Sequence, residues 1–172
     1  GTQSFIHGVP LYGTMIGIED LRMKDAVVGV VHFPALNDMM WASKGSGAFW
    51  NGRPSKVSEI NSLSAATLLA TDTNHIGERS DAAIFEKLRK ETKLFRMWGD
   101  CYGHMMVATG RAEIMVDAKM NLWDVAALKP ILEEAGGTIF DWKGKSSLYI
   151  TDAIACNGAL ADLILKKLTL IN

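Results

Sequence analysis

One acidic residue, Asp124, lies where a helix is expected to begin, in the stretch NLWDVAALKPILEEAGG. Leu128 follows it at a spacing of four, so both side chains share the apolar, inward face of that helix. An aspartate in a first helical turn commonly caps free backbone N–H groups and complements the helix dipole. An inward carboxylate at a helix start is also a suitable oxygen ligand for Mg²⁺. The spacing by itself favours the capping role and leaves the metal role open.

The opening of the chain, GTQSFIHGVP, is the second candidate. Gly1 and Thr2 precede a short amphipathic turn and can simply start a helix there. Free N–H groups at a helix start can also bind a phosphate, because they point toward it and the helix dipole favours negative charge. The residues favour the plain helix start over the phosphate site.

Three segments, in order along the chain, resemble signatures of the inositol monophosphatase family. GTQSFIHGVPLYGTMIG is similar to the segment that starts within D-P-I-D-G-T-x-x-F-x-x-G-x-P, and GAFWNGRPSKVS resembles G-A-F-x-N-G-x-x-x-x-V-S. WDVAALKPILEEAGGTIFDW resembles W-D-x-A-A-x-x-x-I-x-E-E-A-G-G. The loop WGDCYG and the later TDAIACNGAL are similar to the histidinol-phosphate phosphatases of this family, whereas inositol phosphatases carry a G-T-A-like loop. The resemblance extends from Gly1 to about Leu163.

This resemblance implies a layered αβαβα sugar-phosphatase fold, of the α/β class. The family's D-P-I-D would end immediately before Gly1, so we expect residues 1–172 to be a single partial domain. It would lack the N-terminal helices, the first strands, two metal-binding aspartates and a glutamate that activates water. We therefore expect an N-terminally truncated member that does not hydrolyse phosphate esters at the family's rate by itself.

The implied reaction is Mg²⁺-dependent hydrolysis of a phosphate monoester by direct attack of water. Metal ions lower the pKa of the attacking water and neutralise charge on the phosphate and the leaving oxygen. By position in the motifs, Asp124 matches a metal ligand, and Thr2 matches the threonine that orients the nucleophilic water. Gly1 and Thr2 match the backbone N–H donors that bind the phosphate.

The same resemblance places substrate recognition in two further segments. Asp117 matches a glutamate that holds a substrate hydroxyl, and Gly99 and Asp100 lie in the substrate-reading loop. Histidinol phosphate carries an ammonium group and an imidazole, whereas an inositol phosphate carries hydroxyls. A carboxylate at Asp100 would favour the cationic substrate through a charge-assisted hydrogen bond. The alternative, that Asp100 caps a helix starting near Tyr102, is equally open.

The remaining polar side chains are interpreted as structural. Four histidines lack metal-ligand spacing, and of these His104 is expected to be a packed core residue: His7, His32, His75 and His104. Cys101 has no histidine-rich setting that would make it a nucleophile. Glu133 and Glu134 lie late in a helix and are expected on a solvated face.

Composition limits the class of protein. The 172 residues are 48% hydrophobic and 22% charged, with 18 basic against 19 acidic residues, which excludes a disordered or strongly basic, nucleic-acid-binding chain. Two separate cysteines make no disulfide framework, and no apolar run approaches the roughly 20 residues of a membrane helix. We expect a small phosphorylated substrate, histidinol phosphate, no nucleic-acid or membrane partner, and a homodimer. The expected location is the cytoplasm, or a plastid if the protein comes from a plant.

The elements that must position these residues alternate between strand and helix in the second half of the chain. Short apolar runs predict strands over 11–18, 26–33, 38–42, 68–71, 93–98, 112–116, 138–142 and 153–156. Periodic segments predict helices over 80–93, 102–109, 123–135 and 160–168, the first capped by Ser80 and the third kinked at Pro130. Without N-terminal helices over the first sheet, we expect exposed apolar side chains around Tyr12, Met15 and Val28.

Two other functions stay open. One is a phosphatase of the same family that acts on inositol 1-phosphate or on nucleotide 3′-phosphates. The other, of a different class, is a catalytically incompetent fragment or binding module, because one aspartate offers Mg²⁺ too few ligands.

Overall fold

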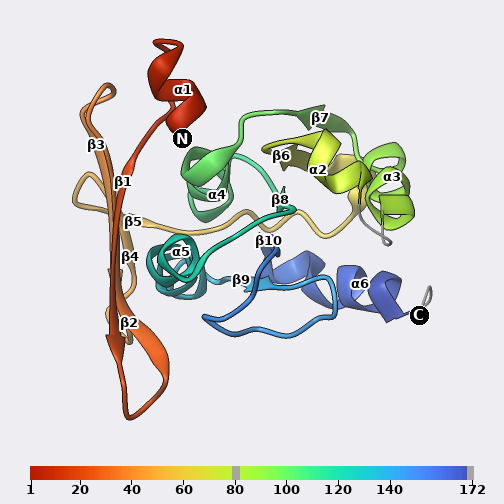
Figure 1. Cartoon of the computed structure of the whole chain (residues 1–172). Helices are drawn as coiled ribbons and strands as arrows, with labels where there is room; N and C mark the ends of the chain where they lie inside the picture. Colours follow the sequence, from red (N-terminus) through yellow and green to blue (C-terminus); the bar gives the residue numbers. More distant parts are fainter. Residues whose placement is uncertain (79–81, 170–172) are drawn as a thin grey trace.

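The computed structural model describes residues 1–78 and 82–169 of the chain. Two five-stranded sheets form separate layers, and helices fill the space between them and cover the far side of the second sheet (Figure 1). A short helix, α1 (Thr2–Ile6), precedes the first sheet. The predicted α/β class and its layered arrangement are confirmed.

The first sheet is an antiparallel meander in chain order. Its strands are β1 (Thr14–Asp20), β2 (Asp25–Phe33), β3 (Asp38–Ser43), β4 (Ala48–Trp50) and β5 (Arg53–Ser55). Tight turns connect β3 to β4 and β4 to β5. Gly45, Gly47, Asn51 and Gly52 there all have positive φ, a backbone conformation that glycine and asparagine adopt most readily.

The second sheet is mixed, in the order β7-β6-β8-β10-β9. Its strands are β6 (Thr67–Ala70), β7 (Leu94–Arg96), β8 (Ile114–Asp117), β9 (Gly137–Phe140) and β10 (Ala153–Asn157). β6 is parallel to β7 and to β8, whereas β10 is antiparallel to β8 and β9. The carboxyl ends of β6, β7 and β8 therefore meet at one edge, where open α/β sheets commonly bind ligands.

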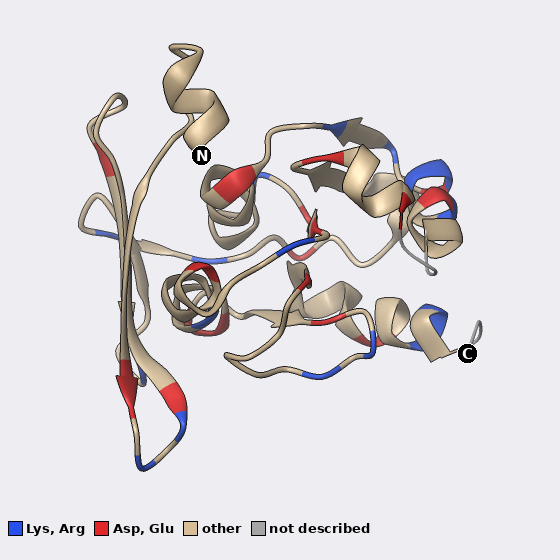
Figure 2. Cartoon of the chain, viewed as in Figure 1, with Lys and Arg blue, Asp and Glu red and all other residues tan. Residues whose placement is uncertain are grey.

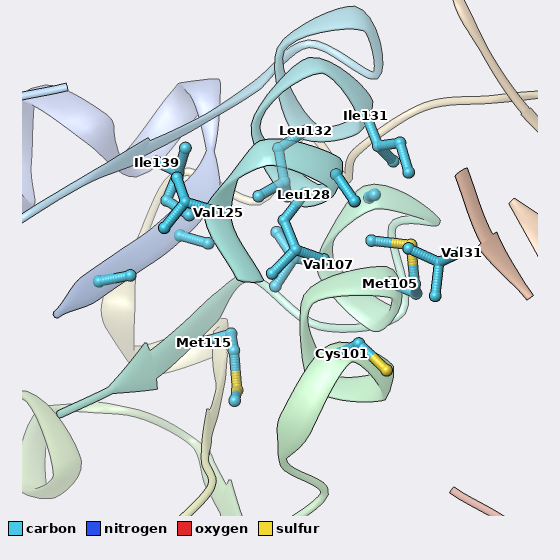
Figure 3. Packing of buried hydrophobic residues seen from close by; sticks show 14 of the residues in the cluster. Val31, Cys101, Met105, Val107, Met115, Val125, Leu128, Ile131, Leu132 and Ile139 are labelled. Atoms are coloured by element: carbon cyan, nitrogen blue, oxygen red, sulfur yellow. The ribbon is translucent and has the colours of Figure 1, made fainter. Parts of the chain in front are cut away.

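Two helices lie between the sheets, α4 (Asp100–Ala108) and α5 (Leu122–Glu134). Side chains of both, such as Met105, Val107 and Leu128, form one core with Val31 and Met115 of the two sheets (Figure 3). Three helices line a second core on the far side of the second sheet: α2 (Thr73–Gly77), α3 (Ala82–Glu91) and α6 (Gly158–Thr169). A 3-10 turn, Leu63–Ala65, precedes β6.

Two glycines let α5 lie directly on the first sheet. A Cβ on Gly29 would be 2.1 Å from the carbonyl oxygen of Ala127, and a Cβ on Gly17 would be 2.6 Å from the carbonyl carbon of Ala126. Only a residue without a side chain allows this approach of strand and helix backbones. α5 continues through Pro130. The Pro130 ring also lies against Gly29, because a Cβ added to Gly29 would be 2.9 Å from Pro130 Cγ.

The opposite face of the first sheet carries a cross-strand apolar row, Ile16, Val30, Trp41 and Phe49, defined by the strand register. The Trp41 and Phe49 rings stack at a centroid distance of 4.3 Å, and the Ile16 side chain is 56% exposed. The described helices lie on the other side of this sheet (Figure 1). The sequence predicted an exposed apolar face on the first sheet. The four residues of this outer apolar row form such a face.

Two of the three side chains predicted on that face lie elsewhere. Val28 does project outward, because its neighbour Gly29 faces α5. Met15 instead pairs with buried Val31 and packs against the core between the sheets. Tyr12 lies before β1, and its ring packs edge-on against Phe5 of α1 at 5.0 Å.

Most predicted elements exist, with ends shifted by a few residues. The strand predicted over 11–18 begins only at Thr14, because residues 11–13 have no partner strand. The helix predicted over 102–109 begins two residues earlier, at Asp100. Ser80 lies outside the described residues, so its predicted capping role is not addressed.

Charges of both signs are spread over sheets and helices (Figure 2). Within residues 1–78 and 82–169, the helices are too short or too polar to cross a membrane.

Candidate active site

Two cavities open at the edge where the carboxyl ends of β6, β7 and β8 meet. The smaller has a volume of about 120 Å³ and the larger about 480 Å³. They adjoin, because Gly1, Thr71 and Asp100 line both. The residues predicted to form the site all line one cavity or both: Gly1, Thr2, Gly99, Asp100, Asp117 and Asp124.

Asp124 lies in the first turn of α5 and lines the smaller cavity. Its Oδ2 accepts hydrogen bonds from the backbone N of Asn121 at 2.9 Å and from Asn121 Nδ2 at 3.2 Å. The capping role favoured by the spacing is therefore confirmed. Both hydrogen bonds use one carboxylate oxygen, so Oδ1 is left as an acceptor for a ligand in the cavity.

A magnesium site would need several oxygen ligands close together. The part of the chain that the structure describes contains no group of three histidine, cysteine, aspartate or glutamate side chains that could hold a metal ion. Asp124 is one suitable oxygen ligand and does not make a site alone. The described residues by themselves do not fit the predicted Mg²⁺.

Asp100 is held at the boundary between the two cavities by Thr71, which follows β6, and by Ser4 of α1. Its backbone N donates to Thr71 Oγ1 at 2.8 Å, and Ser4 Oγ donates to its Oδ2 at 3.5 Å. Asp100 has φ of 54°, a conformation uncommon for a residue with a side chain. These contacts outweigh that conformational cost and direct the carboxylate toward the cavities.

The capping role that was left open for Asp100 is wrong. The helix begins at Asp100, the N-cap position belongs to Gly99, and no side chain caps it. Gly99 allows the loop to approach β6, since a Cβ there would be 2.4 Å from the Cα of Thr71. The loop therefore carries a carboxylate that is available for a ligand.

Asp117, the last residue of β8, forms a buried pair with His104 of α4. His104 Nε2 lies 2.9 Å from Asp117 Oδ2. His104 is 0% exposed and Asp117 is 8% exposed, and both line the smaller cavity. The prediction of a packed His104 is confirmed, but its pairing with Asp117 was not predicted, because the two residues are thirteen positions apart and lie on different elements.

The expected helix is present at the start of the chain. Gly1 occupies the N-cap position of the five-residue α1, and no side-chain hydrogen bond caps this helix. Thr2 is exposed and lines the larger cavity. The roles predicted for Gly1 and Thr2 toward a phosphate and a water stay predictions.

Other interpretations of polar residues fare unevenly. Burial raises the pKa of the Cys101 thiol to about 11, so this residue is no nucleophile at neutral pH, as expected. Glu134 is not simply solvated, because its two carboxylate oxygens accept from the backbone N of Gly45 and of Gly47, at 2.7 Å each. Glu133 pairs with Lys129 at 3.0 Å.

Sequence reasoning missed two residues of the site. Thr71 lines both cavities and supports Asp100, and Lys119 lines the smaller cavity. Their positions directly after β6 and β8 are the available signal, because residues that follow parallel strands gather at one edge.

Comparison with known proteins agrees with this arrangement. The model of the inositol monophosphatase family matches residues 1–171. The chain belongs to the inositol monophosphatase family. It is 50% identical over 162 residues to a histidinol-phosphatase of Chlorobaculum parvum, which covers 93% of this chain and 61% of that protein. It is 34% identical over 170 residues to a fructose-1,6-bisphosphatase/inositol-1-monophosphatase of Thermotoga maritima, covering 96% of this chain and 63% of that protein.

A solved family structure has the same fold. The inositol monophosphatase from Zymomonas mobilis superposes with a TM-score of 0.88 at 26% identity, over 98% of this chain and 67% of that one. The 172-residue chain spans less than two thirds of the length of the Chlorobaculum parvum and Thermotoga maritima proteins.

Proposed function

We propose that this chain contributes to a phosphate monoester hydrolase that converts histidinol phosphate and water into histidinol and inorganic phosphate. The observation that carries the proposal is the 50% identity to a histidinol-phosphatase, over 93% of the chain. The carboxylates of Asp100 and Asp117, both in the smaller cavity, support the substrate choice. Carboxylates accept charge-assisted hydrogen bonds from an ammonium group.

The described residues would act mainly by positioning. Asp100 and Asp117 hold the cationic end of the substrate, which places its phosphate toward Thr2 and Asp124. The Thr2 hydroxyl orients the water that attacks phosphorus, and the backbone N–H groups of Gly1 and Thr2 bind the phosphate oxygens. The water oxygen forms a bond to phosphorus, the bond from phosphorus to the histidinol oxygen breaks, and the histidinol oxygen takes a proton released by that water.

Dependence on Mg²⁺ is part of this proposal. A metal ion would neutralise phosphate charge and lower the pKa of the attacking water. Since the described residues offer Asp124 as a single ligand, we propose that further oxygen ligands are needed for turnover. The isolated chain should then bind Mg²⁺ weakly and hydrolyse phosphate esters far more slowly than a complete site does. In that respect it would resemble a non-catalytic binding module.

A second candidate substrate is inositol 1-phosphate. The 34% identity to the Thermotoga maritima protein and the fold of the Zymomonas mobilis protein favour it. Inositol hydroxyls can also donate hydrogen bonds to Asp117. A nucleotide 3′-phosphate is a third substrate of the same reaction class.

The test is phosphate release with Mg²⁺ from histidinol phosphate and from inositol 1-phosphate in parallel. It compares the 172-residue chain with a protein expressed from the upstream-extended reading frame, called the extended protein below. Faster release from histidinol phosphate by the extended protein would support the proposal, and a preference for inositol 1-phosphate would refute the substrate choice. No release by either protein would favour the binding module.

We also propose a cytoplasmic homodimer without a nucleic-acid or membrane partner. In the 172-residue chain, the outer apolar row on the first sheet supports self-association, because exposed apolar patches commonly mark contact surfaces. Light scattering coupled to size-exclusion chromatography would give the molar mass, and a monomer at micromolar concentration would refute the dimer.

A further inference from the structure

In the buried pair of His104 and Asp117, the chemistry of the two groups determines which one donates the hydrogen bond. An ionised carboxylate can only accept hydrogen bonds, so His104 Nε2 carries the proton and donates it to Asp117 Oδ2 over 2.9 Å. This leaves Asp117 Oδ1 as an acceptor at the wall of the smaller cavity, which both residues line.

The other ring nitrogen of His104 shows how little else holds this side chain. His104 Nδ1 is buried and has no hydrogen-bond partner among the described residues. Burial of a polar atom without a partner is unfavourable. A fully buried histidine with one polar contact is therefore a poor choice for stability alone, and its single polar contact is with a residue of the cavity.

Asp117 needs this contact, because a carboxylate on a strand end can rotate unless a neighbour holds it. Asp100, another carboxylate of the smaller cavity, already has support from Thr71 and Ser4. His104 is the corresponding support for Asp117. The two carboxylates then present fixed oxygens to the same cavity.

We propose that His104 is a positioning residue that selects amine-bearing substrates by holding Asp117 Oδ1 toward the cavity. This inference rests on the proposed phosphatase function and adds a determinant of its substrate choice. A fixed carboxylate favours an ammonium group over a hydroxyl, since the charge-assisted bond is the stronger. His104 itself does not need to touch the substrate.

The experiment measures kcat and KM of the extended protein on histidinol phosphate and on inositol 1-phosphate, for a double-mutant cycle. His104→Leu removes the donor and keeps most of the volume, and Asp117→Asn removes the charge. We expect His104→Leu to lower the ratio of kcat/KM for histidinol phosphate over inositol 1-phosphate about tenfold to 100-fold, mainly through KM. Loss of a hydrogen bond to a charged group has this size.

Two features separate positioning from a merely structural role. In the Asp117→Asn background, His104→Leu should change the ratio little, because the group through which it acts is gone. His104→Gln, whose amide can donate from a similar place, should restore much of the preference. If His104→Leu does not fold, His104→Met, which also lacks a donor and has a similar volume, takes its place in both backgrounds.

Two outcomes would overturn the proposal. An unchanged ratio of kcat/KM, which includes equal loss on both substrates, or full additivity with Asp117→Asn would each show that His104 does not select through Asp117. If the parent protein itself prefers inositol 1-phosphate, the proposed substrate fails. If positions 104 and 117 are then coupled on inositol 1-phosphate, His104 positions Asp117 but does not select an amine. Failure of the proposed substrate is thereby distinguished from failure of the positioning role.

Discussion

Substitution of Gly29 by alanine tests the close packing of α5 on the first sheet. The new Cβ would lie 2.1 Å from the carbonyl oxygen of Ala127, whereas ordinary van der Waals contact begins at 3.4 Å. The obstacle is backbone and has no flexible side chain to turn aside, so the helix or the strand must move by about 1 Å. Overpacking of this kind costs about 1–3 kcal/mol, and a backbone obstacle places Gly29→Ala at about 2–3 kcal/mol.

Thermal unfolding followed by circular dichroism measures this cost. For a chain of 150–250 residues, each kcal/mol lowers Tm by about 2–4 °C, so we expect a decrease of about 4–12 °C. Gly77→Ala is the matched control, because nothing lies within 4 Å of its added Cβ and its φ is ordinary. Its Tm should stay equal or rise slightly, since alanine is the better helix former.

Gly29→Ala should also disturb the candidate active site, because Asp124 lies in the first turn of α5. A displacement of about 1 Å can lower a rate about 100-fold when it misplaces a reacting group. Activity of the extended protein, assayed well below its Tm, should therefore fall in Gly29→Ala and not in Gly77→Ala. A Tm of Gly29→Ala within 1 °C of the parent would refute the close backbone approach described for α5.

Three further substitutions or reagents test other contacts. Lys129 Nζ lies 2.8 Å from Asp25 Oδ1, and the two side chains are 7% and 21% exposed. Burial raises the pKa of Asp25, but the hydrogen bond and charge of Lys129, the backbone N–H of Ala26 and the charge of Lys44 together lower it below its ordinary value. The pair therefore stabilises the fold above about pH 4 and loses this effect as the pH falls through the lowered pKa, so Lys129→Met should cost about 1–3 kcal/mol at pH 7 and less at pH 3 in urea unfolding. Burial raises the pKa of the Cys101 and Cys156 thiols to about 11 and about 12, so both should react with Ellman's reagent at pH 8 only after denaturation; rapid reaction of the native protein would contradict their burial. Asp100→Asn should lower the preference for histidinol phosphate over inositol 1-phosphate, and an unchanged ratio of kcat/KM would contradict its role in selecting the cation.

Local sequence patterns identified the elements better than their ends. Strands and helices are largely where apolar periodicity placed them, because side-chain spacing along one element is a local property. The ends depend on partners: β1 starts at Thr14, opposite His32 of β2, and α4 starts at Asp100, whose backbone N is bound by Thr71. Such partners are distant in sequence, so composition near the element's end does not reveal them.

The candidate site shows the same division. Resemblance to the family's motifs placed Asp124, Asp117 and Asp100 in one site, and the structure brings them to one cavity. Two residues that hold these side chains, Thr71 and His104, were marked by no motif. Thr71 follows a different strand, and His104 looked like an ordinary core residue.

The sequence by itself determined the family, the α/β class and the acidic residues of the site, since these follow from short motifs and from apolar periodicity. Only the tertiary structure decided which groups hold those acids. Asp117 is fixed by His104 because α4 packs beside the end of β8, and Glu134 binds the turn at Gly45 because α5 lies against the first sheet. Hydrogen bonds between elements depend on packing distances, and packing distances arise only when the whole chain has folded.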